Sequence, residues 1–142
     1  MNIEVPINDY IASLPEPKRS DITILHQRIR QALPQEKIWF FDGKNDQGKI
    51  VANPTIGYGR QTLTYADGKT KEFYQIGISA NTTGISIYVI GLADKHYLPN
   101  TYGKTIGKAS VTGYCIKFKN LNDIKLDILD ILIQDALKQT TN

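Results

Sequence analysis

Residues 71–90 read KEFYQIGISANTTGISIYVI, and this stretch decides the fold. Apolar side chains recur at every second position on both sides of a turn at Asn81 to Gly84. Such alternation is typical of β-strands, and an Asn and Gly-bounded break is typical of a hairpin turn. The pattern predicts strands at 71–79 and 85–90 that pair antiparallel.

Alternation also predicts which side chains share a face, because successive residues of a strand point to opposite sides. We expect one face to lie under helices and to carry Tyr74, Ile76, Ile78, Ile85, Ile87, Val89, Tyr114, Ile116 and Phe118. We expect the opposite face to be mixed and to carry Phe73, Gln75, Gly77, Ser86, Tyr88, Cys115 and Lys117.

The same period-two signal extends over residues 37–118 and predicts further strands. They are expected at 38–41, 49–53, 55–59, 61–65 and 113–118. Asp67-Gly68 marks a second hairpin turn between two of the strands. Helices are expected at 7–14, 17–33 and 124–138, with one short helical turn at 99–102.

Strands framed by helices, without a regular βαβ alternation, predict an α+β fold. We expect a mostly antiparallel sheet of about five to six strands. The N-terminal and C-terminal helices should pack on one of its faces.

Length and composition limit the class of protein. The chain has 142 residues, of which 41% are hydrophobic and 22% charged, as expected for a single domain over 1–142. The formal charge of +3 gives no support for a nucleic-acid partner. One cysteine rules out an internal disulfide and fits a reducing, cytoplasmic setting. None of the apolar runs in the sequence is long enough to predict a membrane-spanning segment.

The mixed face suggests a binding site for a small ligand. Aromatic bodies beside a few polar groups are the usual lining of such sites. The candidate residues are Trp39, Tyr58, Arg60, Gln75, Tyr88, Cys115 and Lys117. A protein-interaction adaptor that works through a surface patch is the alternative that the sequence leaves open.

A basic segment near the end of the sheet suggests an anion site. Residues 91–119 hold Lys104, Lys108 and Lys119 beside several glycines. Lysine with backbone N–H groups can hold an anion. A solvated loop explains the same residues, since lysine is usually exposed.

Metal binding has one candidate cluster. Asp123, Asp127 and Asp130 fall on one flank of the last predicted helix, and carboxylates suit hard cations and iron. A solvated helix start explains them as well, because acidic residues favour a helix N-terminus. No zinc motif is present, since His26 and His96 are far apart in sequence.

Catalysis has little support in the sequence. The chain has no nucleophile-elbow, metalloprotease or dinucleotide motif. A free cysteine is usually buried and inert, so we expect Cys115 to be a core residue rather than a nucleophile. The chain is therefore expected not to be an enzyme.

The last helix should be covered on two sides. Ile124, Ile128 and Ile131 lie opposite its main apolar stripe. We expect the N-terminal segment to fold over the helices as the main cover. A second copy of the chain, forming a homodimer, is the other possible cover.

Several short motifs, in order, resemble the YdhG-like family of small bacterial proteins of unknown function. They are 9–15 (DYIASLP), 32–34 (ALP), 102–104 (YGK), 107–109 (GKA) and 113–124 (GYCIKFKNLNDI). The resemblance implies an α/β sandwich in the bacterial cytoplasm. One member is described as a frataxin-like iron chaperone, so the resemblance also implies iron as a possible cargo. Frataxins present iron on an acidic first helix, whereas the first long helix here carries Lys18, Arg19, Arg28 and Arg30.

Overall fold

A computed structural model describes residues 3–34 and 36–140. The helices are α1 (Glu4–Ser13), α2 (Lys18–Ala32), α3 (Tyr97–Tyr102) and α4 (Leu126–Thr140), with a 3-10 turn, η1 (Leu121–Asp123), before α4. The strands are β1 (Ile38–Phe41), β2 (Thr55–Tyr58), β3 (Gln61–Thr64), β4 (Thr70–Phe73), β5 (Ile76–Ala80), β6 (Ile85–Val89), β7 (Ser110–Val111) and β8 (Cys115–Phe118).

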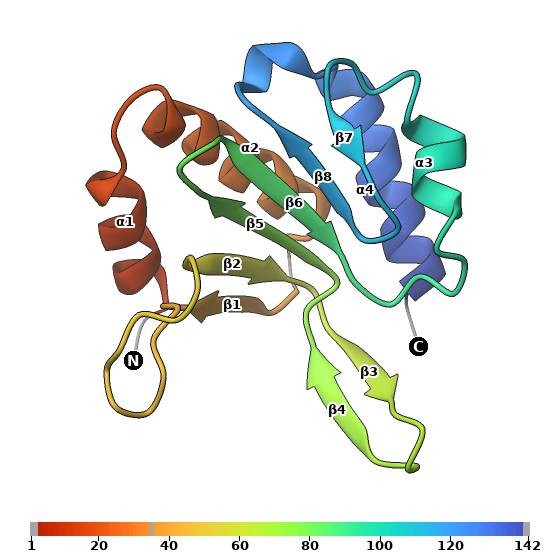
Figure 1. Ribbon diagram of the computed structural model, residues 1–142, viewed down its shortest axis with the longest axis horizontal. Helices are drawn as coiled ribbons and strands as arrows, with labels where there is room; N and C mark the ends of the chain where they lie inside the picture. Colours follow the sequence, from red (N-terminus) through yellow and green to blue (C-terminus); the bar gives the residue numbers. More distant parts are fainter. Residues whose placement is uncertain (1–2, 35, 141–142) are drawn as a thin grey trace.

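Six of the strands form one sheet in the order β1-β2-β5-β6-β8-β7, and every pair in it is antiparallel. Strands β3 and β4 form a separate hairpin that projects from the end of β2 and β5 (Figure 1). The prediction of an α+β fold with an antiparallel sheet of five to six strands is confirmed.

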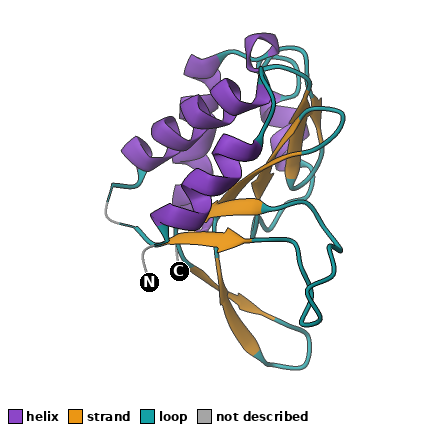
Figure 2. Cartoon of the chain, turned by 90° about the vertical axis from the view of Figure 1, so that its left-hand side faces the viewer, coloured by secondary structure: helices purple, strands orange, loops and turns teal. Residues whose placement is uncertain are grey.

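The long helices lie on one face of the six-stranded sheet, behind the strands in Figure 1 and to one side of them in Figure 2. The core lies between these two layers. Ile22, Leu25 and Ile29 of α2 are fully buried in the same cluster as Ile76 and Ile78 of β5. Burying such side chains stabilises the fold by about 1.5–3 kcal/mol each. The opposite face of the sheet carries no helix of the described chain at β1, β2 and β5.

Two predicted strands differ from the structure. The stretch 49–53 is a loop, because the N–H groups of Val51 and Ala52 both donate to the Gly43 carbonyl and turn the chain back toward β1. The predicted strand 71–79 is two strands, β4 and β5, which belong to different sheets. The interruption falls at Tyr74 and Gln75 and shifts the alternation there.

The base of the β3–β4 hairpin is held by two buried glutamines. The Gln61 amide donates to the carbonyls of Tyr74 and Ile90, at 3.0 and 2.6 Å. The Gln75 amide donates to Thr140 Oγ1 in the last turn of α4, at 2.9 Å, while its oxygen accepts from the Arg60 N–H. These bonds fix the hairpin at one angle to the main sheet.

The N-terminal helix covers a different part of the fold than expected. Ile7 and Tyr10 of α1 are buried, and the Tyr10 ring packs on Phe40 of β1. In Figure 1, α1 and α4 lie at opposite ends of the helical layer. The prediction that the N-terminal segment is the main cover of the second apolar side of α4 is wrong for Ile131, which is 57% exposed in the described chain. Cover by a second copy of the chain stays a prediction. None of the described helices is long and apolar enough to cross a membrane.

Candidate functional site

The face of the sheet that lies away from the helices carries one continuous row of paired residues. Trp39 pairs with Gly57, Gly57 with Gly77, Gly77 with Tyr88, and Tyr88 with Cys115. Because paired residues of antiparallel strands point to the same side, all five belong to one face. We call this side the open face.

The two glycines of the row, Gly57 and Gly77, leave space for the ring of Tyr74. A Cβ at Gly57 would come within 2.8 Å of Tyr74 Cγ, and a Cβ at Gly77 within 2.6 Å of Tyr74 Cε1. No other residue type leaves room for the Tyr74 ring, which therefore lies flat on the backbone of β2 and β5. Burial raises the pKa of the Tyr74 hydroxyl to about 12.

Three residues lie on a different side of the sheet from the one predicted. Tyr74 was expected under the helices but lies on the open face, against Gly57 and Gly77. Gln75 was expected on the open face but bonds to Thr140 of α4. Tyr114, also expected under the helices, is 60% exposed. Tyr74 and Gln75 lie in the break between β4 and β5, and Tyr114 precedes β8, so strand alternation does not govern them.

Four rings touch one another on the open face, and we call them the aromatic cluster: Trp39, Phe41, Phe73 and Tyr74. Trp39 is 6.1 Å from Phe41 and 6.3 Å from Phe73 between ring centroids. Phe41 is 5.7 Å from Phe73, and Phe73 is 4.2 Å from Tyr74. Tyr74 is buried beneath the others, whereas Trp39 and Phe73 are half-buried and Phe41 is 37% exposed.

Hydrogen bonds orient parts of the aromatic cluster. The Trp39 indole N–H donates to the Gly59 carbonyl at 2.8 Å, which sets the orientation of the ring. The Gln61 amide donates to the Tyr74 carbonyl and Gln61 pairs with Phe73 across the hairpin, which places these two residues. A rigid aromatic surface loses little entropy on binding and so favours association.

The residues predicted for a small-ligand site fall on two sides of the sheet. Trp39, Tyr88, Cys115 and Lys117 lie on the open face. Tyr58 and Gln75 lie on the helix side, where the Tyr58 hydroxyl is 2.6 Å from His26 Nδ1. Arg60 is an exposed residue between β2 and β3.

Cys115 is buried, as predicted, although it belongs to the open face. Burial raises the pKa of its thiol, and the Lys117 ammonium and a hydrogen bond to Ser86 oppose this only partly. A protonated, covered thiol is a poor nucleophile.

Two of the three predicted anion-site lysines come together. Lys108 and Lys119 line a hollow of about 420 Å³ with Lys117 and Asp123, at the β7–β8 end of the sheet. Lys104 is exposed just after α3 and does not line this hollow. The three lysines of the hollow are exposed, as solvated lysines also are.

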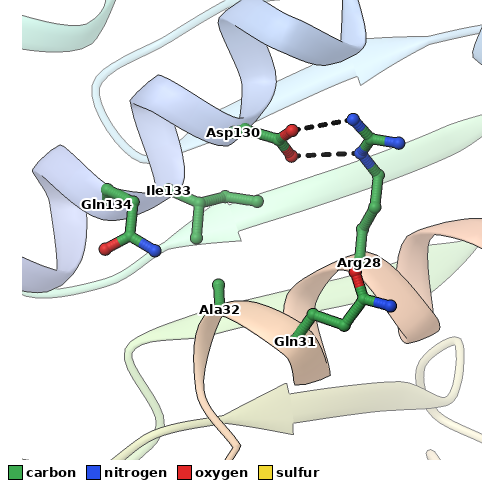
Figure 3. A pocket seen from close by; sticks show the side chains of 6 residues that line it. All are labelled: Arg28, Gln31, Ala32, Asp130, Ile133 and Gln134. Carbon is green, nitrogen blue, oxygen red and sulfur yellow. Dashed lines mark hydrogen bonds and ion pairs between the residues drawn. The ribbon is translucent and has the colours of Figure 1, made fainter.

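The predicted acidic cluster is divided among other contacts. Asp130 forms a two-bond ion pair with Arg28 of α2, with Nε and one terminal nitrogen at 3.0 and 2.7 Å (Figure 3). Asp123 accepts from the Asn120 N–H in the capping box of η1, and Asp127 lies in the first turn of α4, where it accepts from the Ile128 N–H. Within residues 3–34 and 36–140, no group of three or more His, Cys, Asp and Glu side chains is placed to hold a metal ion.

A buried pair on the helix side stands apart from these sites. His26 Nε2 is buried without a hydrogen-bond partner in the described chain and lies 4.0 Å from Glu4 Oε2. Burial lowers the pKa of His26, with Glu4 raising it and Arg30 lowering it. Glu4 also forms an ion pair with Arg30 at 2.7 Å, so the His26 ring lies beside a charge pair that joins α1 to α2.

An exposed apolar patch lies beside β1. Val5, Ile50 and Val51 are 56%, 72% and 63% exposed. Pro6, Phe40 and Val51 line a hollow of about 500 Å³ that Phe41 also borders. Clustered exposed apolar residues are typical of interaction surfaces.

Sequence reasoning missed Phe41 and the lysines that accompany the cluster. Lys37 Nζ lies 3.8 Å from the Trp39 ring centroid, and Lys71 Nζ lies 4.9 Å from that of Phe73. Lys37 precedes Trp39 by two positions, and Lys71 precedes Phe73 by two positions. In an extended chain this spacing places each lysine on the same face as its aromatic residue. That repeated spacing was the available signal.

No family model, curated protein or solved structure matches this chain.

Proposed function

We propose that this protein is a non-catalytic binding module that takes a flat ligand onto the aromatic cluster of its open face. The observation that carries the proposal is the unbroken chain of ring contacts from Trp39 through Phe41 and Phe73 to Tyr74. Trp39, Phe41 and Phe73 of this cluster keep exposed surface. Flat π-surfaces prefer to stack on other rings.

A single tryptophan in the whole chain makes the proposal testable, because Trp39 belongs to the cluster. We expect its fluorescence to change when planar compounds, neutral and charged, are titrated into the protein. Phe73→Ala should weaken binding about twofold to tenfold, since one ring contact is worth roughly 0.5–1.5 kcal/mol.

Tyr65→Ala is the matched control, because Tyr65 is an exposed aromatic residue at the tip of the same hairpin. It should leave binding unchanged. The proposal fails if no planar compound alters the fluorescence of Trp39, or if Tyr65→Ala weakens binding as much as Phe73→Ala.

A protein-interaction adaptor is the second candidate, and the exposed patch of Val5, Ile50 and Val51 favours it. Replacing Ile50 and Val51 by Ser tests it. Loss of a protein partner with unchanged ligand binding would assign the patch to interaction. Iron handling in the cytoplasm remains what the YdhG-like resemblance implies, and the Arg28–Asp130 pair does not support it.

A further inference from the structure

Two ammonium groups lie beside the exposed rings of the aromatic cluster. Lys37 belongs to the segment leading into β1, and Lys71 belongs to β4. Their Nζ atoms lie 3.8 and 4.9 Å from the centroids of Trp39 and Phe73, and these two rings touch each other. Two positive charges therefore flank one pair of rings.

Neither lysine is engaged by a carboxylate. The ion pairs of the described chain join other residues, and Lys37 and Lys71 belong to none of them. A cation above an exposed ring is held only weakly, so both ammonium groups remain available to an anion.

The rest of the open face also favours a negative ligand. Its strand positions carry Trp39, Phe41, Thr55, Gly57, Gly77, Ser79, Ser86, Tyr88, Ser110, Cys115 and Lys117. None of these residues is acidic, so no negative charge at these positions of the six-stranded sheet repels an anion that approaches the rings.

The distribution of charge favours a small ligand over a polymer. A single strand of nucleic acid needs a continuous positive groove along its backbone. Here Gly57, Gly77, Ser79 and Ser86 separate the cluster from Lys117, and all four are uncharged. The positive charge at the cluster is thus local and suits one anionic group.

We infer that the ligand of the aromatic cluster is a small planar anion of the mononucleotide class. Its ring packs against the exposed surface of the edge-to-face pair Trp39 and Phe73, while the Lys37 and Lys71 ammonium groups leave the ring faces to hold its anionic group. This inference rests on the proposed function and adds the charge of the ligand. Charge-assisted contacts to phosphate or carboxylate supply orientation, and stacking supplies the apolar contact.

Calorimetric titration of the full chain with adenosine monophosphate, uridine monophosphate, adenosine and inorganic phosphate tests the inference. We expect both monophosphates to bind, adenosine to bind about fivefold to thirtyfold more weakly, and phosphate alone not to bind measurably. Equal affinity for adenosine and its monophosphate would overturn the inference and leave the proposed function standing. Binding of none of the aromatic probes would overturn both.

Lysine variants locate the anionic group. Lys37→Gln and Lys71→Gln should each lower monophosphate affinity about twofold to fivefold and reduce its dependence on salt, without affecting adenosine. Lys69→Gln is the control, because Lys69 is exposed in the same hairpin but pairs with Asp67. An equal loss in all three variants would overturn the assignment to Lys37 and Lys71. A short single-stranded oligonucleotide that binds where monophosphates do not would show a polymer as the ligand instead.

Discussion

The Tyr74 ring lies directly on the backbone of Gly77, so close that a Cβ at residue 77 would come within 2.6 Å of Tyr74 Cε1. The contact joins the β3–β4 hairpin to the centre of the six-stranded sheet. It also places the Tyr74 ring beneath the tilted rings of Phe41 and Phe73 on the open face.

Replacing Gly77 by Ala should therefore displace the Tyr74 ring. We expect the free energy of unfolding to fall by about 1–3 kcal/mol, the usual cost of overpacking, as measured by denaturant titration. In a Tyr74→Ala background the same replacement should cost much less, because the clash is gone. A cost that is independent of residue 74 would contradict the contact.

The buried Cys115 thiol should react slowly with labelling reagents in the folded protein and fast after denaturation. Burial both covers the sulfur and raises its pKa, which lowers the thiolate fraction. Time courses of labelling with and without denaturant give the comparison. Equal rates in the two states would mean that Cys115 is accessible and would reopen a catalytic role.

Stability should decrease as the pH falls below about 6.5, the ordinary pKa of histidine. Burial lowers the pKa of His26 in the folded state, so the unfolded chain binds the proton more readily. Protonation at low pH therefore stabilises the unfolded state more than the folded state. The contribution of neutral His26 to stability is fully present above the pKa of the unfolded state, and it is lost as the pH falls through the pKa of the folded state.

Unfolding curves between about pH 7.5 and pH 5.5 measure this effect, in a range where carboxyl groups stay ionised. His26→Gln should flatten the pH dependence, whereas His96→Gln, at an exposed loop position, should not. A wild-type curve that is level over this range would contradict the prediction.

The Arg28–Asp130 pair should contribute little to stability. Its side chains are 34% and 48% exposed, and exposed pairs are worth about 0–1 kcal/mol because water and salt screen them. Asp130→Asn should lower the free energy of unfolding by no more than this amount, and added salt should reduce the difference. Asp127→Asn, one turn earlier on α4, serves as the comparison. A loss of several kcal/mol would show that the pair is more deeply buried than described.

The parts of the fold that follow from local chemistry could be predicted from the sequence. The β5–β6 turn formed as expected because Asn81 Oδ1 accepts the N–H groups of Thr83 and Gly84, all within four residues. The pairing of apolar faces in β5, β6 and β8 followed from alternation. These signals depend only on neighbouring residues.

The aromatic cluster depends on contacts that alternation does not contain. Trp39 and Phe41 come from β1, Phe73 from β4, and Tyr74 from the break that follows. These rings come into contact only because of the register in which β1, β2 and β5 pair, and because Tyr74 lies on the open face rather than under the helices. Period-two reasoning placed Trp39 and Phe73 correctly as individual residues, but it could not bring them together.

The bond from Gln75 to Thr140 has a consequence for how the protein is made. Gln75 is buried at the centre of the chain's length, and Thr140 belongs to the last turn of α4. During synthesis on the ribosome the N-terminal residues emerge first, so the amide of Gln75 waits without this partner until 65 further residues have been added. A buried amide without its partner is costly. The sheet therefore reaches its final stability only after translation has passed residue 140, and a ribosome stalled before that point holds an incompletely stabilised chain.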